Sequence, residues 1–536
     1  MTSLVVIEVT KALGFRISSS AARCTRHRSL SIPRPFVSRS RSFASSSSEH
    51  QLPPSSHPPL DLHLDDLVAA LPQVEVSTNS YELELHGHGE SYHPTAMPDV
   101  VLKPKTAKDV ALILQHATKF HLPVIPYGAG TSGEGEINAI HGGISLDMAE
   151  FKNIDIAESP SDDSIADPYA VVGAGVTRKQ LNQALRHTGM QFVVDPGADA
   201  TLGGMVATSA SGTTTVRYGG MRENILALEC VVPPKTPDEP ALIIQVGTKA
   251  LKNSAGYDLV SLFCGSEGTL GVITSVTVKL HPIPEHVVAA TCQFESLYQA
   301  ASAVAMLKLC CHGGLTRCEL LDSSAVQAFN AYNHENPDIA VKPTLFLEFQ
   351  GHSDTFLDEM INMTENICVQ DYGGSSFDCA SAEEDRHALW SARHSLLYAS
   401  LAMRPGATGA IITDACVPLS KFAELIDQTA ADVKEKGVVG PCFGHAADGN
   451  FHVILPVKDD DTDEDMEILH GINDRLIDRT LAVGGTCTGE HGIGYGKMVY
   501  LKRQYGQGGL DVMVAVKASL DPHNIMNPGK VVVPKA

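Results

Sequence analysis

The sequence predicts an α+β protein with two folded domains behind a processed N-terminal segment. At 536 residues the chain is longer than a single hydrophobic core usually supports. Apolar residues make up 43% and charged residues 19% of it, as in globular proteins, and no run of about 18 apolar residues is present that spans a bilayer. Strand-like and helix-like patterns alternate along most of the chain, without an internal repeat.

The segment 1–48 differs in composition from the rest. It contains eight basic residues, one acid and many serines. This composition is typical of a transit peptide, whereas a secretory signal needs an apolar core and a small-residue cleavage site. We expect a mitochondrial transit peptide over 1–48; a disordered basic tail that binds nucleic acid or membrane is the alternative.

Charge and cysteine content exclude some partners and carriers. Removing residues 1–48 moves the formal charge from −22 to −29, and so acidic a surface repels nucleic acid and attracts basic partners. The twelve cysteines include no C-x-x-C pair, so zinc-ribbon and iron–sulfur spacings are absent. Electrons handled by this protein therefore need another carrier.

The first domain is expected over 94–283, after a linker and N-terminal segment over 49–93. A short helix over 62–71 and a strand over 100–103 come first. Thr106 and Asp109 then form a capping box, and Val110, Ile113, Leu114 and Ala117 give the following helix an apolar face. A strand over 123–127 leads into a glycine loop, and short β runs with one or two helices follow as far as residue 280.

A second, α+β domain with a C-terminal helical segment is expected over 284–536. Its boundary is indicated by HPIPE (281–285), where two prolines interrupt the strand pattern. Beyond it, helical and strand patterns alternate; the helices are expected over 297–309 and 325–331, and the strands over 344–350, 411–417 and 451–455.

The glycine loop GAGTSG (128–133) matches the G-x-G-x-x-G spacing of dinucleotide-binding folds. That fingerprint requires a helix to begin at the third glycine, and the sequence that follows, EGEINAIHGG, leaves no room for one. A phosphate-cradling loop of bare backbone N–H groups is the better interpretation. Two more glycine-rich segments, 195–221 and 265–274, allow close approach to a large flat ligand, with the hydroxyls of Thr201, Ser209 and Thr213 as polar contacts.

A second cluster of chemistry-bearing residues lies near the C-terminus. In FGHAADGNFHV (443–453) a D-G-N turn separates His445 from His452, so that both imidazoles flank a hairpin. Glu490, in GTCTGEHGIGYGKM (485–498), completes a His₂Glu set of the type that binds catalytic zinc or manganese. His491 cannot easily ligate the same ion as its neighbour, which leaves it free to act as a base. The alternative is that these are ordinary polar loop residues.

These glycine-rich and histidine-rich motifs together resemble the FAD-binding PCMH-type flavoproteins (vanillyl-alcohol oxidase-like), in their branch of D-lactate and glycolate dehydrogenases. The resemblance extends from about His93 to Lys530, and its last motif is DPHNIMNPGKV (521–531). It implies a two-subdomain FAD-binding domain followed by an α+β substrate-binding cap. Because YGAGTSG lacks the histidine through which some relatives attach FAD, the flavin should be non-covalent.

The resemblance also implies which residues bind FAD. The glycine loop would hold the pyrophosphate, and the second glycine-rich segment would line the isoalloxazine and ribityl chain. The implied cofactor residues are Pro126, Tyr127, Gly128, Ala129, Gly130, Thr131, Ser132, Pro196, Gly197, Thr201, Gly203, Gly204, Ser209, Gly212, Thr213, Arg217, Tyr218, Glu267, Gly268, Ile273 and Asn527.

By the same resemblance, His445, His452 and Glu490 would hold a divalent metal, zinc or manganese, and His491 would take the proton of the substrate hydroxyl. Arg393 would pair with the substrate carboxylate; it follows Trp390, the single tryptophan, which we expect to pack that helix. Ala447 stands where the family usually has glycine, and its methyl group matters only if that position needs a positive φ.

The implied activity is FAD-dependent, metal-assisted oxidation of a D-2-hydroxy acid, first of all D-lactate to pyruvate, with electrons passed to cytochrome c. D-2-hydroxyglutarate and glycolate are alternative substrates, although the segment 411–421 offers no cation for a distal carboxylate before Lys421. A quinone or an electron-transfer flavoprotein is an alternative acceptor. Outside this class, a flavin-free metallohydrolase leaves the glycine-rich segments unexplained, and a catalytically silent flavin-binding module remains open.

Overall fold

The first part of the fold is a small sheet of four strands. The computed structural model describes residues 63–158, 166–311, 313–332 and 339–534, so the expected transit peptide lies outside the described residues. The four-stranded sheet has the order β1-β2-β4-β3, with β2, β4 and β3 parallel and β1 antiparallel. Its strands are β1 (Glu75–Ser77), β2 (Val100–Lys103), β3 (Val124–Tyr127) and β4 (Ile144–Asp147).

Helix α4 (Ala107–Phe120) connects β2 to β3 and packs the core of this sheet. Its N-terminus is closed by the expected capping box of Thr106 and Asp109, and the predicted apolar face is buried. Helices α2 (Leu64–Ala70) and α3 (Ser80–Leu85) precede it. The expected elements of this region are therefore confirmed, and no helix begins at the glycine loop, as the sequence predicted.

A five-stranded antiparallel sheet follows, in the order β5-β6-β10-β8-β9. Its strands are β5 (Ile154–Ile156), β6 (Tyr169–Gly173), β8 (Ile225–Val232), β9 (Leu242–Gly247) and β10 (Val272–Lys279). Short helices connect them: α5 (Arg178–Leu185), α6 (Leu202–Ala207), α7 (Thr215–Tyr218), α8 (Met221–Asn224) and α9 (Leu259–Phe263). A two-stranded ribbon of β7 (Met190–Gln191) and β11 (His281–Pro282) closes the region.

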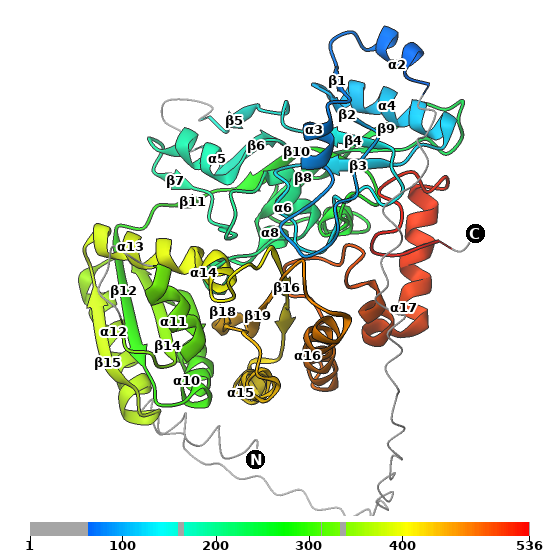
Figure 1. Ribbon diagram of the computed structural model, residues 1–536. Coiled ribbons are helices and arrows are strands. Elements are labelled where there is room, and N and C mark those ends of the chain that lie inside the picture. Colours follow the sequence, from blue (N-terminus) through cyan, green and yellow to red (C-terminus); the bar gives the residue numbers. More distant parts are fainter. Residues whose placement is uncertain (1–62, 159–165, 312, 333–338, 535–536) are drawn as a thin grey trace, which may run out of the picture. The chain divides into compact units, whose positions relative to one another are not determined.

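An eight-stranded antiparallel sheet forms the second half of the protein, seen in Figure 1 as the green to orange strands. Seven strands have the order β15-β12-β14-β13-β18-β19-β16, and β17 pairs with β19. They are β12 (His286–Gln293), β13 (Leu315–Leu321), β14 (Thr344–Gly351), β15 (Ser375–Ala380), β16 (Gly409–Ile412), β17 (Ala415–Cys416), β18 (Cys442–His445) and β19 (Asn450–Val457).

Both faces of this sheet are covered by helices, because its strands carry apolar residues on both sides. Leu345 and Leu347 of β14 pack in one core, whereas Phe346 between them packs in the other. The first core contains residues of α10 (Leu297–Cys310), α12 (Asp354–Glu365), α15 (Leu419–Lys436) and α16 (Asp463–Ala482). The second contains residues of α11 (Ser323–Tyr332), α13 (Glu383–His394) and α14 (Leu396–Ala402), with Trp390 buried among them as expected.

The expected strand over 411–417 is two strands in the structure. β16 ends at Ile412 and β17 begins at Ala415, because the side chains of Thr413 and Asp414 bond to other segments. A π-helix, Asn366–Asp371, extends α12, and a single 3-10 turn, Ala446–Asp448, connects β18 to β19.

The C-terminal helix α17 (Met498–Leu520) returns to the first half of the protein. Val516 and Leu520 pack against the core beneath the five-stranded sheet. The chain then crosses to the first sheet, where Met526 bridges to Val124. None of the described helices is long and apolar enough to cross a membrane.

Candidate active site

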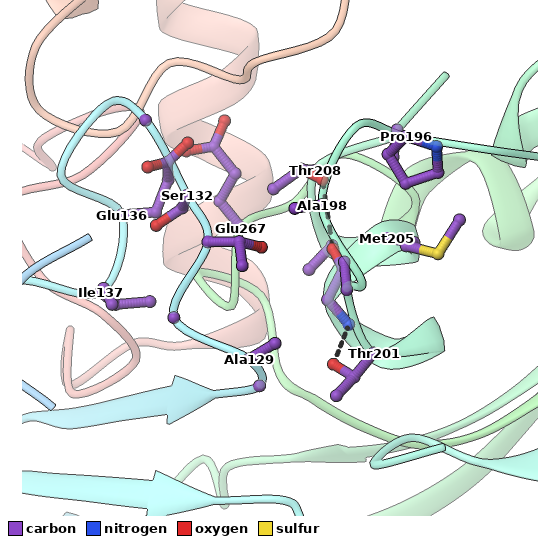
Figure 2. Close-up of a pocket in the computed structure, with 18 of the residues that line it drawn as sticks. Ala129, Ser132, Glu136, Ile137, Pro196, Ala198, Thr201, Met205, Thr208 and Glu267 are labelled. Carbon is purple, nitrogen blue, oxygen red and sulfur yellow. Dashed lines mark hydrogen bonds between the residues drawn. The ribbon is translucent and has the colours of Figure 1, made fainter. Parts of the chain in front are cut away.

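A cavity of about 320 Å³ lies between two glycine-rich segments. One wall is the loop that follows β3, and the other is formed by residues 196–211, which include α6. Figure 2 shows Ala129 and Thr201 on opposite sides of this space. We call it the cofactor cavity. A long flat ligand placed here meets backbone on both sides.

Glycines are needed in these walls for two reasons. A Cβ on Gly128 would lie 2.4 Å from Oγ1 of Thr201, so the two walls approach each other too closely there for any side chain. A Cβ on Gly133 or Gly197 would meet no protein atom within 4 Å, so the backbone at these two positions is bare toward the cavity. Such a cradle fits the close approach of a dinucleotide.

The phosphate end of a dinucleotide has to be bound here without basic side chains. Among the described residues that line the cavity there is no lysine or arginine. A diphosphate would therefore be bound by backbone N–H groups and hydroxyls of the loop, as in other anion-binding nests. The residues present thus fit FAD.

Two buried glutamates, Glu136 and Glu267, line one end of the cavity, where Figure 2 shows them together. Burial raises the pKa of Glu136 above its ordinary value and that of Glu267 to about 8. Glu267 also accepts hydrogen bonds of 2.7 Å from the backbone N–H groups of Ile493 and Gly494. It thereby joins the cavity to the Glu490–His491 loop.

His445, His452 and Glu490 converge on one point. Nε2 of His445 and Nε2 of His452 each lie 3.1 Å from Oε1 of Glu490. Nδ1 of His452 donates to the carbonyl of Thr413 (3.0 Å), and Nδ1 of His445 bonds to the carboxylate of Glu319 (2.7 Å). Both Nε2 atoms thus face one carboxylate oxygen, and in the neutral rings their lone pairs would be directed at a cation bound between them.

The local fold brings these three side chains together. β18 ends at His445, the turn Ala446–Asp448 and Gly449 (φ 75°) reverse the chain, and β19 carries His452 opposite Phe443. Ala447 is buried and does not have a positive φ, so its methyl group leaves the turn undisturbed. The predicted turn is confirmed.

His491 lies between this cluster and the cofactor cavity. Its ring stacks on that of His452, with centroids 4.7 Å apart, and it lines the cavity beside Glu490. Nδ1 of His491 is buried without a hydrogen-bond partner, 4.0 Å from Oδ2 of Asp414. Burial lowers the pKa of His491 to about 4, so that the imidazole is neutral at physiological pH.

Three residues that the sequence analysis missed support this cluster. Ser211 donates a hydrogen bond to Oε2 of Glu490 from the opposite wall. Glu319, in β13, orients His445; although its burial favours the neutral form, His445 and Arg393 hold its pKa below the ordinary value. Asp414 accepts hydrogen bonds from the Glu490–His491 loop. A carboxylate inside an apolar strand pattern, as in IITDACV, was the signal for Asp414; Ser211 and Glu319 had none.

Arg393 is buried next to Glu319, which also bonds to His445. Nε and Nη2 donate to Oε2 of Glu319 at 3.0 and 2.5 Å, and the guanidinium stacks over Phe443. Since Glu319 also bonds to His445, Arg393 is connected to a candidate metal ligand. It lines neither of the two cavities described here.

Most of the implied cofactor residues line the cofactor cavity, and five do not. Ser209 lines a second cavity instead. Arg217 and Tyr218 bond across to Gln350 of β14. Thr213 bonds to Asp195 and Arg317, and Gly212 packs against Asp195, where a Cβ would lie 2.4 Å from the carbonyl oxygen.

The second cavity, of about 740 Å³, reaches the same cluster from another direction. His445, Asp448 and Glu490 line its inner end, and Arg222, Tyr505 and Val512 lie at its exposed end. We call it the outer cavity. Glu490 and Ser211 separate it from the cofactor cavity, because both residues line both spaces.

Two family patterns match the sequence. The pattern described as "FAD binding domain" matches residues 98–235, and that described as "FAD linked oxidases, C-terminal domain" matches residues 283–531.

Individual proteins resemble the chain over most of its length. It is 44% identical to the "Probable D-lactate dehydrogenase, mitochondrial" of Danio rerio over 85% of this chain and 88% of that one. It is 37% identical to the "D-lactate dehydrogenase [cytochrome], mitochondrial" of Arabidopsis thaliana, over 86% and 78% respectively. The solved structure of an alkyldihydroxyacetonephosphate synthase has the same fold, with a TM-score of 0.66 at 19% identity over 89% of this chain and 87% of that one.

Proposed function

The chain belongs to the family of FAD-linked oxidases, and from this premise we propose that it is a D-2-hydroxy acid dehydrogenase that oxidises D-lactate to pyruvate. The observation that carries the proposal is the convergence of His445, His452 and Glu490 at 3.1 Å beside a cavity that fits FAD. The motifs predicted this family and an α+β fold with an FAD-binding part and a cap. Both predictions are confirmed.

The proposed reaction removes two hydrogens from the C2 carbinol of the acid. FAD, when bound, would supply the acceptor for the hydride of C2, and a divalent cation would acidify and orient the hydroxyl. His445, His452 and Glu490 hold the cation, and Nε2 of His491 accepts the hydroxyl proton. The carbinol thereby becomes a carbonyl, and electrons and protons balance.

Arg393 is the proposed cation for the substrate carboxylate, and because it lines neither cavity in this structure, the contact requires its side chain to move toward the substrate. Its guanidinium is buried and already pairs with Glu319, so binding a second carboxylate requires it to contact both. A glycolate or D-2-hydroxyglutarate dehydrogenase would use the same three metal-binding residues and the same base. The rates of flavin reduction by the three acids distinguish these activities. A flavin-free metallohydrolase is disfavoured by the FAD-binding family pattern over residues 98–235.

The remaining expectations form part of the same proposal. Residues 94–283 would bind FAD, and residues 284–536 would carry the metal and substrate site. The relatives are named as mitochondrial proteins, and the basic, serine-rich segment 1–48 would be a transit peptide. The formal charge of −22 suits a basic one-electron carrier such as cytochrome c as acceptor.

The test is anaerobic reduction of the bound flavin. We expect the purified protein to absorb near about 450 nm and to bleach with D-lactate faster than with glycolate or D-2-hydroxyglutarate. A chelator should slow bleaching without releasing flavin, and Mn²⁺ or Zn²⁺ should restore it. Bleaching at full rate by protein that metal analysis shows to be cation-free would refute the metal-assisted reaction.

The variant His491→Ala isolates the proton acceptor. It should retain its flavin absorbance and its affinity for the cation, and lose roughly 10²- to 10⁴-fold in the rate of flavin reduction, the usual contribution of a general base. His470→Ala, a histidine of α16, is the control and should reduce flavin at the wild-type rate. Equal rates in both variants would remove His491 from the mechanism.

A further inference from the structure

Asp414 sits where the chain leaves one strand of the eight-stranded sheet and enters the next. It follows Thr413 in the break between β16 and β17, and its side chain has no exposed surface. A buried carboxylate is retained only where donors compensate for the loss of water.

One oxygen of this carboxylate collects four donors from a single loop. Oδ2 accepts hydrogen bonds from Oγ1 of Thr488 (2.8 Å) and from three consecutive backbone N–H groups, those of Gly489 (2.7 Å), Glu490 (2.8 Å) and His491 (2.9 Å). Successive N–H groups directed at one point form an anion-binding nest. In this protein the anion is part of the chain.

The loop held by this nest carries both groups that the proposed reaction needs. With the backbone of Glu490 and His491 fixed on Asp414, the Glu490 side chain reaches the two histidines at 3.1 Å, and the His491 ring stacks on His452. Gly489 allows the approach, since a Cβ there would lie 2.2 Å from Nδ2 of Asn450, and Gly492 has a φ of 83°.

Thr413 and Asp414 also bond to the hairpin that carries His452. Oδ1 of Asp414 accepts from Nδ2 of Asn450 (2.7 Å), at the start of β19. The carbonyl of Thr413 accepts from Nδ1 of His452 (3.0 Å), and its hydroxyl from the N–H of Val453 (2.8 Å). The loop at 488–491 and the hairpin that carries His452 are about 40 residues apart in sequence. Hydrogen bonds to Thr413 and Asp414 thus fix the position of one relative to the other.

We propose that Asp414 is a positioning residue: its carboxylate occupies the nest at 489–491 and thereby fixes Glu490 relative to His452 and His491 into the cofactor cavity. This inference rests on the proposed function for the roles of Glu490 and His491. It implies that the nest, once emptied, accepts a small free carboxylate.

The test removes the carboxylate and supplies another. Asp414→Ala should keep its flavin, lose roughly 10- to 100-fold in affinity for Mn²⁺, as is usual when a group that orients a metal ligand is removed, and reduce flavin more slowly. Formate added at millimolar concentrations should raise both the Mn²⁺ affinity and the rate. Mn²⁺ affinity is measured by electron paramagnetic resonance, independently of turnover.

Two control variants distinguish a positioning role of Asp414 from two other effects: the general loss of a buried carboxylate and the loss of a metal-binding side chain. Asp432→Ala removes a carboxylate of α15 that pairs with Arg475 and Arg479 on α16, and formate should change nothing there. Glu490→Ala removes the ligand itself, so formate should not restore Mn²⁺ affinity.

Asp414→Asn provides a second route if the alanine variant does not fold. The side-chain oxygen of the introduced asparagine can accept from the N–H groups of the nest, but its NH₂ group then faces Nδ2 of Asn450, which is also a donor. Mn²⁺ affinity should therefore fall, and because the nest is occupied, formate should not restore it. Wild-type affinity and rate in the asparagine or alanine variant, or an alanine variant that formate leaves unchanged, would overturn the inference. Failure of wild-type protein to reduce flavin with any of the acids would instead overturn the proposed function, with the Mn²⁺ measurement unaffected.

Discussion

Glu267 illustrates how a single buried carboxyl group connects the cofactor cavity to the Glu490–His491 loop. It is about 6% exposed and has a positive φ of 52°, a strained conformation for a residue other than glycine. Its two oxygens accept from Ile493 and Gly494 at 2.7 Å. Burial raises the pKa of this carboxyl to about 8, against 4.5 for an ordinary glutamate.

This shift predicts a pH dependence of stability. Between pH 4.5 and 8 the folded protein holds a proton on Glu267 that the unfolded chain does not, so raising the pH lowers the free energy of unfolding. In Glu267→Gln this contribution is absent. The stability of wild type relative to the variant should therefore shrink by about 1 kcal/mol per pH unit over this range.

Urea denaturation at pH 5.5, 6.5 and 7.5 measures the difference. Glu295→Gln, at an exposed glutamate that pairs with Lys342, is the control and should show no such trend. A difference between wild type and Glu267→Gln that stays constant with pH would show that Glu267 titrates normally.

At the scale of single residues, the sequence motifs predicted which side chains form the candidate site. His445, His452, Glu490 and His491 stand in recognisable local patterns, and the structure brings all four together. Asp414, Glu319 and Ser211 act through hydrogen bonds to residues 76, 126 and 279 positions away, respectively. No local pattern encodes such distances.

At the scale of elements, α17 forms one side of the outer cavity. Tyr505, Val512, Met513 and Val516 line it from this helix, and Val512 is 64% exposed at its mouth. FAD would fill the cofactor cavity. The outer cavity, which reaches His445 and Glu490, would then be a route from solvent to the proposed metal site.

Val512→Trp tests this route. A bulky ring at the mouth should lower kcat/KM for D-lactate several-fold while leaving kcat and flavin content near wild type, because it hinders entry and touches no reacting group. Ala518→Trp, on the same helix but outside the cavity, should have no effect. Steady-state kinetics decide, and identical kcat/KM values in both variants would place the entrance elsewhere.

Element boundaries followed the sequence where local signals were strong. The capping box of Thr106 and Asp109 correctly predicted where α4 begins. The segment 411–417 was wrongly predicted as one strand, because its β-forming composition gave no sign that Thr413 and Asp414 bond to β19 and to the loop after Thr488. Tertiary contacts overrode local propensity at that point.

At the scale of the whole molecule, Arg317 ties the eight-stranded sheet to the first half of the chain. From β13 its guanidinium donates to Oε2 of Glu348 (2.6 Å), to Oδ2 of Asp195 (3.1 Å) and to Thr213 (2.8 Å). It also stacks over Trp390, with Cζ 4.9 Å from the ring centre. Asp195 and Glu348 are both buried, and Arg317 is a charged partner of each.

Arg317→Met should therefore destabilise the protein by about 3–5 kcal/mol, since it leaves two buried carboxylates without their charged partner. Trp390, the single tryptophan, reports the change directly through its fluorescence during urea denaturation. Lys342→Met, which removes an exposed ion pair with Glu295, should cost less than about 1 kcal/mol. Similar losses in the two variants would contradict a cross-sheet role for Arg317.

The sequence by itself determined the family, the glycine-rich segments and many of the helices and strands, because backbone preferences and short motifs are local properties. The assignment of His445, His452 and Glu490 as metal ligands stays a prediction. The tertiary structure decided which cofactor candidates face the cavity: Arg217 and Tyr218 turn to β14, and Arg393 pairs with Glu319. It also brought Asp414 beneath the Glu490–His491 loop. Buried polar groups must find partners wherever the fold provides them, and only the folded chain shows where that is.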